Sequence, residues 1–217
     1  MKIFFTALLF TTGLFFAPSV FAAEQTSQFD ATIQIRSDAA IEVTESIAYD
    51  FGNEQRHGIF RDIPISYKAR GGNFSLRISD ISVVDEIGKP YQFTTSFPGS
   101  NVQLKIGDPD VLITARHVYV IKYTIKRAMN YFKDHDELYW NVTGNDWHVG
   151  ILGASVNIIL PKTIDSQTIQ TDCFAGVFGS TKKCRDIQKK PFQTDRVLFD
   201  HSPLNPGEGL TIVLGIP

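Results

Sequence analysis

The sequence predicts an all-β protein, an antiparallel β-sandwich of about ten strands. Apolar and polar residues alternate in short runs from Phe29 onwards, and Gly, Pro, Asn and Asp stand between the runs. Hydrophobic residues make up 43% of the 217 residues, which is enough for a packed core. We expect residues 23–217 to form a single domain.

The expected strands have turn residues at their ends. Gly107-Asp108-Pro109-Asp110 suits a β-turn with the proline at its first central position. The alternation slips by one residue after Ile78, which predicts a β-bulge near Ser79-Asp80. The residues from Asn130 to Glu137 are polar and are expected to form a charged loop. In chain order, the expected strands are residues 29–35, 41–51, 59–65, 74–83, 91–97, 102–106, 119–125, 138–142, 154–160, 197–199 and 210–216.

Residues 1–22 have the pattern of a signal peptide. Lys2 is followed by an apolar run, and Val20 and Ala22 occupy the −3 and −1 positions of a signal-peptidase site. An uncleaved anchor is the alternative, for which the apolar run is short. We therefore expect an exported chain, in the periplasm or on the extracytoplasmic face of a membrane. No later apolar run approaches bilayer length, so a membrane contact would need segments absent from this chain.

Two charged residues take apolar positions in neighbouring strands. Glu45 interrupts the apolar phase of residues 41–51, and Arg61 interrupts that of residues 59–65. Because an unpaired buried charge is costly, the sequence predicts a buried Glu45–Arg61 ion pair. The alternative is a bulge near Gly58 that turns Arg61 outward, with Asp62 as its partner.

Cys173 and Cys184 are the two cysteines of the chain. An even count in an exported chain favours a disulfide, and the glycines between them allow the loop to close. A catalytic thiol is the alternative, which a pair with no cysteine left over disfavours.

Several segments resemble those of a known family, the YciQ-like predicted bacterial membrane proteins. The resemblance rests on residues 41–45 (IEVTE), 56–64 (RHGIFRDIP) and 136–144 (DELYWNVTG), with Trp147 and the glycine-containing cysteine loop following. It implies a signal peptide, an extracytoplasmic β-rich domain of unknown function, and membrane helices after it. On this resemblance the chain is either the outer part of a longer protein or a free-standing relative. The family brings no catalytic residues to carry over.

A candidate binding surface lies within residues 130–150, where aromatic and charged residues cluster around turns. Such residues could stack on a sugar or grip a partner, although Trp140 is in phase with the core. The candidate residues are Tyr131, Asp136, Glu137, Tyr139, Asp146, Trp147 and His148.

Composition and motifs exclude several functions. A net charge of −2 and the lack of a basic run argue against nucleic acid. The five histidines lack the spacing of a zinc helix, and residues 133–137 lack the glycine of a calcium loop, so we expect no metal and no cofactor. The sequence therefore favours a non-enzymatic domain that binds an unknown envelope protein or glycan. The alternatives are a carbohydrate-binding module or a cell-wall hydrolase using Asp136, Glu137 and Trp147.

Overall fold

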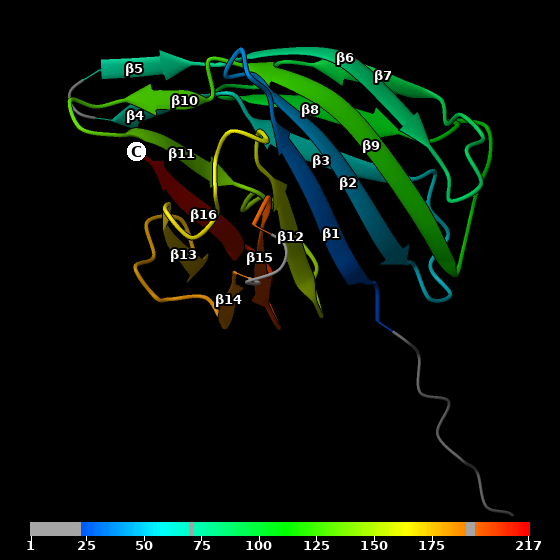
Figure 1. The fold of residues 1–217 in the computed structure, drawn as a ribbon. Coiled ribbons are helices and arrows are strands. Elements are labelled where there is room, and N and C mark those ends of the chain that lie inside the picture. The colour runs from blue at the N-terminus through cyan, green and yellow to red at the C-terminus, as the bar shows by residue number, and fades with distance from the viewer. Residues whose placement is uncertain (1–22, 70–71, 190–193) are drawn as a thin grey trace, which may run out of the picture.

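The computed structural model describes residues 23–69, 72–189 and 194–217, and every regular element within them is a β-strand (Figure 1). The all-β prediction is confirmed, although the strands are more numerous than expected. In chain order they are β1 (Gln25–Ile35), β2 (Ile41–Asp50), β3 (Ile59–Pro64), β4 (Ser66–Ala69), β5 (Gly72–Ser75), β6 (Arg77–Val84), β7 (Phe93–Ser96), β8 (Asn101–Ile106), β9 (Arg116–Lys126), β10 (Met129–Tyr131), β11 (Asp136–Asn141), β12 (Ala154–Ile159), β13 (Gln170–Gly176), β14 (Asp186–Gln188), β15 (Arg196–His201) and β16 (Gly209–Ile216).

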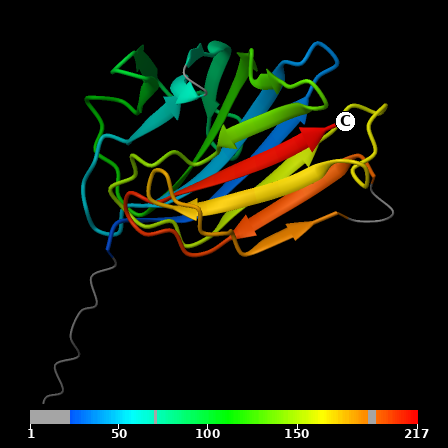
Figure 2. The ribbon, with the colours of Figure 1, turned by 90° about the vertical axis from the view of Figure 1, so that its left-hand side faces the viewer.

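The strands form a sandwich whose second layer is divided. The first layer is a seven-stranded sheet, here the large sheet, in the order β14-β15-β12-β1-β2-β9-β6. The second layer consists of the C-terminal sheet, β10-β11-β16-β13, and the β8 sheet, β3-β8-β7. Strands β4 and β5 form a separate hairpin. Figure 2 shows β16, in red, passing in front of the blue strands β1 and β2 of the large sheet.

One pairing differs from the antiparallel prediction. Strand β1 pairs with β12 in parallel, with Phe29 opposite Ala154, while the other named pairs are antiparallel. Between β1 and β12 the chain passes through the second layer, and parallel neighbours need such a crossover. The sequence signals single strands, but it does not signal which distant strands become neighbours.

Two local expectations are corrected by the structure. The strand expected over residues 74–83 is broken at Leu76, between β5 and β6. The expected loop from Asn130 to Glu137 is instead a hairpin, in which β10 pairs with β11 and Tyr131 lies opposite Asp136. Strand β10 has three residues, too few for the alternation by which strands are recognised.

Other turn and bulge expectations agree with the structure. The register of β6 against β9 shifts between Ser79 and Ser82, and Asp80 has a φ of 56°. The amide of Val111 donates to the carbonyl of Asp108, which closes a turn with Pro109 at the expected position.

Gly58 and Gly107 meet where β3 begins and β8 ends. Their φ angles are +142° and +131°, and a Cβ on either residue would overlap a carbonyl of the opposite strand, that of Ile106 or of His57. Only glycine allows two backbones to approach so closely. This contact fixes the entry into β3 and hence the direction in which Arg61 points.

The core lies between the two layers. The alternate residues of β2 and β3 that the sequence assigned to the core are buried, from Ile41 to Tyr49 and from Ile59 to Ile63. Within the described ranges, no helix has the length and apolar character that crossing a membrane requires.

Candidate functional site

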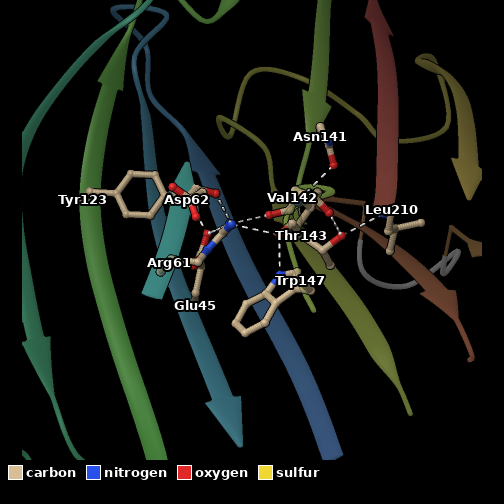
Figure 3. Close-up of polar contacts among 10 residues, drawn as sticks. Glu45, Arg61, Asp62, Tyr123, Asn141, Val142, Thr143, Trp147 and Leu210 are labelled. Carbon is tan, nitrogen blue, oxygen red and sulfur yellow. Dashed lines mark hydrogen bonds and ion pairs between the residues drawn. The ribbon is translucent and has the colours of Figure 1, made fainter. Parts of the chain in front are cut away.

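The ion pair expected from the alternation lies in the middle of the sandwich (Figure 3). The side chains of Glu45 and Arg61 are 0% and 1% exposed. Arg61 Nε and Nη2 donate to the two carboxylate oxygens of Glu45, each at 2.7 Å. The alternative geometry, with Arg61 turned outward, does not occur.

The remaining guanidinium hydrogens join Arg61 to the C-terminal sheet. Nη1 donates to the carbonyls of Asp62 and Thr143, and Nη2 donates to the carbonyl of Val142 at 2.8 Å. Arginine has five N–H donors, so these contacts and those to Glu45 use all of them. Arg61 thus connects strand β3, strand β2 of the large sheet and the turn after β11. We call Glu45, Arg61, Tyr123, Val142 and Thr143 the Arg61 cluster.

Tyr123 completes the coordination of Glu45. Its hydroxyl donates to Glu45 Oε1 at 2.6 Å. Burial, followed by the nearby charge of Glu45, holds the pKa of Tyr123 well above its usual value. Burial alone lowers the pKa of Arg61, but the attraction of Glu45 outweighs it and the net shift is upward. The carboxylate therefore faces a charged guanidinium and a neutral phenol, an arrangement suited to stability rather than to proton transfer.

Trp147, expected on the candidate surface, lies in the core instead. It is 8% exposed, and its ring packs edge-on against Phe29 and beside Tyr49. Its indole N–H donates to the carbonyl of Thr143 at 2.8 Å, which satisfies the only polar atom of the ring. The turn of Gly144 to Asp146 folds the chain back so that this aromatic residue reaches the interior.

A cleft of about 600 Å³ crosses the outer face of the C-terminal sheet. We call it the sheet cleft. Its floor contains Tyr139 of β11, Thr211 of β16 and Phe174 of β13, and its volume is typical of ligand pockets. One wall is the loop from Gly176 to Ser180, and the lining also includes two residues of the β8 sheet, Pro64 of β3 and Asn101 of β8.

The candidate residues divide between this cleft and other parts of the molecule. Glu137, Tyr139 and Asp146 line the cleft, whereas the other four candidates do not. Successive residues of a strand point to opposite faces, so Asp136 lies on the other face of β11 from Glu137. Of the four candidates outside the cleft, Tyr131 and His148 are exposed, Asp136 is partly buried and Trp147 is buried.

Cys173 and Cys184 form a disulfide, with Cα atoms 5.4 Å apart. We call residues 173–184 the cysteine hairpin. Its two arms are also joined by backbone hydrogen bonds, from Ala175 to Lys182 and from Cys184 to Cys173. The first arm is the end of β13, the second arm pairs with it, and the loop between the arms forms the cleft wall, with Phe178 90% exposed at its tip.

A chain of amides connects the Arg61 cluster to this wall. Asn141 accepts a hydrogen bond from the Gly144 amide and donates one to Asn145 Oδ1 at 2.7 Å. Asn145 in turn donates to the carbonyls of Gly176 and Gly207, each at 3.1 Å. Through the turn after β11, the buried ion pair therefore fixes both the floor and the wall of the cleft.

Sequence reasoning missed the hairpin tip and the amide pair. Val177 and Phe178 form an apolar pair between glycines inside a disulfide loop, a signal that could have marked an exposed tip. Asn145 follows Gly144 in a turn, and nothing in the sequence places it beside Gly176. In the part of the chain that the structure describes, no group of three or more His, Cys, Asp or Glu residues is arranged to hold a metal ion.

Known proteins resemble this chain both in sequence and in fold. It is 27% identical over 184 residues to the uncharacterized protein YciQ of Escherichia coli (strain K12), a match that covers 80% of this chain and 29% of YciQ. The chain therefore spans less than a third of the length of this curated relative.

Solved structures share the fold at low sequence identity. Native leukotriene A4 hydrolase from Saccharomyces cerevisiae matches with a TM-score of 0.50 at 10% identity, over 88% of this chain and 29% of that protein. A second structure of the native yeast enzyme matches with a TM-score of 0.52 at 11% identity, over 89% of this chain and 29% of that one. At this identity the likeness concerns the fold alone.

The model of one protein family matches almost all of the described chain. It covers residues 25–216, from the first residue of β1 to the last residue of β16. The chain belongs to the family described as the N-terminal domain of predicted membrane proteins (DUF2207).

Proposed function

We propose that this chain is a non-enzymatic extracytoplasmic domain, the outer part of a membrane-anchored envelope protein, and that it binds an envelope partner in the sheet cleft. Membership of a predicted membrane protein family and the disulfide support a position outside the cytoplasm. The sheet cleft is the observation that carries the binding role.

The cleft presents exposed aromatic and apolar side chains on a rigid frame. Tyr139 is 46% exposed on a paired strand, and Val177 and Phe178 are 62% and 90% exposed on a disulfide-bonded hairpin. Binding is favoured when contact residues are held in place before the ligand arrives, because less conformational entropy is lost. The amide chain from Asn141 to Gly176 contributes to this rigidity.

The hydrolase alternative requires Asp136, Glu137 and Trp147 to lie in one site. Trp147 is buried and bonded to Thr143, and Asp136 points to the opposite face of β11 from Glu137. These three residues therefore do not form one site, whereas binding requires only the surface that Glu137 and Tyr139 share.

The test compares two tyrosines that lie on opposite faces of one hairpin. Co-sedimentation of the purified, exported chain with isolated bacterial envelopes measures binding. We expect Tyr139→Ala and Phe178→Ala each to weaken binding roughly tenfold, as removal of a central aromatic contact commonly does. Tyr131→Ala is the matched control, since Tyr131 is 68% exposed and lies outside the cleft. Equal losses in Tyr139→Ala and Tyr131→Ala would contradict a role for the cleft.

A further inference from the structure

Two aromatic rings stand open to a ligand in the sheet cleft. Tyr139 projects from the floor and Phe178 from the wall. Phe174 also lines the cleft, but Lys183 lies over its ring, with Nζ 4.4 Å from the centroid, and Lys183 also pairs with Asp172. An exposed ring offers a flat apolar face, which suits the C–H face of a sugar ring as well as an apolar side chain.

Oriented amide groups lie beside these rings. The hydrogen bonds of Asn141 and Asn145 to each other and to backbone groups fix both side chains. Among the contacts of the described residues, Asn141 uses one of its two amide hydrogens, and each amide oxygen accepts one hydrogen bond. A carbonyl oxygen has two lone pairs. The pair therefore retains a donor and two acceptors in fixed directions, as hydroxyl recognition requires.

The charge of the residues that line the cleft disfavours anionic ligands. Glu137 and Asp146 line the cleft, and no Lys, Arg or His is among its described lining residues. Lys183, which lies over the Phe174 ring, is paired with Asp172. Two carboxylates without a basic partner repel phosphate and other anionic groups, but they accept hydrogen bonds from hydroxyls.

A cationic peptide also suits two carboxylates, but the strand pairing disfavours it. Extended peptides are commonly held by adding a strand to a free sheet edge. In the cleft floor β11 lies between β10 and β16, and β16 lies between β11 and β13. Along the part of β13 that lines the cleft, the far edge pairs with the returning arm of the cysteine hairpin, through Cys173 and Ala175. The floor therefore presents side chains rather than unpaired backbone.

We propose that the ligand of the sheet cleft is a neutral glycan chain, stacked on Tyr139 and Phe178 and hydrogen-bonded through its hydroxyls to Asn141, Asn145 and Glu137. This proposal rests on the proposed function and narrows the envelope partner to one chemical class.

The first test removes the other classes of partner from the envelope. Envelopes are digested with proteinase K and extracted with organic solvent, and the remaining glycan fraction is used for co-sedimentation. We expect the chain to bind this fraction as well as it binds untreated envelopes, with Tyr139→Ala roughly tenfold weaker. Binding that vanishes after proteinase K or after lipid extraction overturns the glycan proposal and leaves the proposed function intact. Binding that is insensitive to both Tyr139→Ala and Phe178→Ala overturns the two proposals together.

The second test addresses charge. Binding of a neutral ligand to the glycan fraction should change by less than about twofold between 0.05 and 0.5 M NaCl, because screening acts on charged contacts. Glu137→Gln retains an acceptor and should cost no more than a few-fold, whereas Glu137→Lys removes it and should weaken binding more. Oligolysine serves as the cationic probe. If it displaces the chain from the glycan fraction, and binding falls steeply with salt, the ligand is not neutral and the proposal is wrong.

Discussion

Arg61 is the residue whose environment is most demanding. A buried arginine is tolerated only when its charge is paired and all its N–H groups donate hydrogen bonds. Here Glu45 and three backbone carbonyls are the partners. Alternation within two short strands was enough to predict the pair. The same alternation could not predict Tyr123, Val142 or Thr143, because these partners come from distant segments. The alternation of apolar and polar residues shows which side of a strand is buried. It does not show which residues from distant segments lie beside that strand in the assembled sheets.

Arg61→Ala should destabilise the fold by roughly 3–5 kcal/mol. The substitution leaves the carboxylate of Glu45 buried without its guanidinium and removes a hydrogen-bond donor from the carbonyls of Val142 and Thr143, although Thr143 keeps the indole N–H of Trp147. Urea unfolding followed by tryptophan fluorescence measures the change, since Trp147 bonds to Thr143 beside the cluster. Arg36→Ala is the control, because Arg36 is 46% exposed in its pair with Glu42 and solvent screens such surface pairs, so they add little to stability. An Arg61→Ala variant as stable as the parent would falsify the structural role.

At the scale of elements, the cysteine hairpin connects stability to the candidate site. The sequence predicted its disulfide from cysteine count and compartment. It did not predict that the hairpin would begin in β13 and form a cleft wall, because no local pattern reveals which face of which sheet a loop covers. The same limit applies to β10, which is too short to be recognised until it pairs with β11.

Removal of the disulfide should weaken both folding and binding. The double variant Cys173→Ala/Cys184→Ala is expected to lose about 2–4 kcal/mol of stability, since the open loop has more freedom in the unfolded chain. Asn145 still bonds to the Gly176 carbonyl, so the fold should persist while the tip carrying Phe178 loses order. Denaturant melts and envelope co-sedimentation, run beside Tyr131→Ala, measure the two effects. A variant with unchanged affinity but reduced stability would show that the hairpin is structural only.

At the scale of the whole molecule, the sandwich class followed from the sequence, but the division of its second layer did not. The C-terminal sheet and the β8 sheet are separate sheets, and Arg61 bridges them from β3 to the turn after β11. A charged residue at a core position was visible in the sequence. Its function as a connection between sheets depends on β3 and β11 becoming neighbours, which period-two alternation does not encode.

The last prediction concerns how the whole chain matures. We expect cleavage after Ala22, because the small residues Val20 and Ala22 fit a signal-peptidase site. Strand β1 begins at Gln25, so this cleavage leaves every described strand intact. Intact mass spectrometry of periplasmic material should give a chain that starts at Ala23 and is about two daltons lighter than its reduced form, owing to the Cys173–Cys184 bond. Ala22→Leu should block processing and leave the precursor in the membrane fraction. If the unsubstituted chain keeps residues 1–22, the apolar run is an anchor and the domain is tethered through its N-terminus.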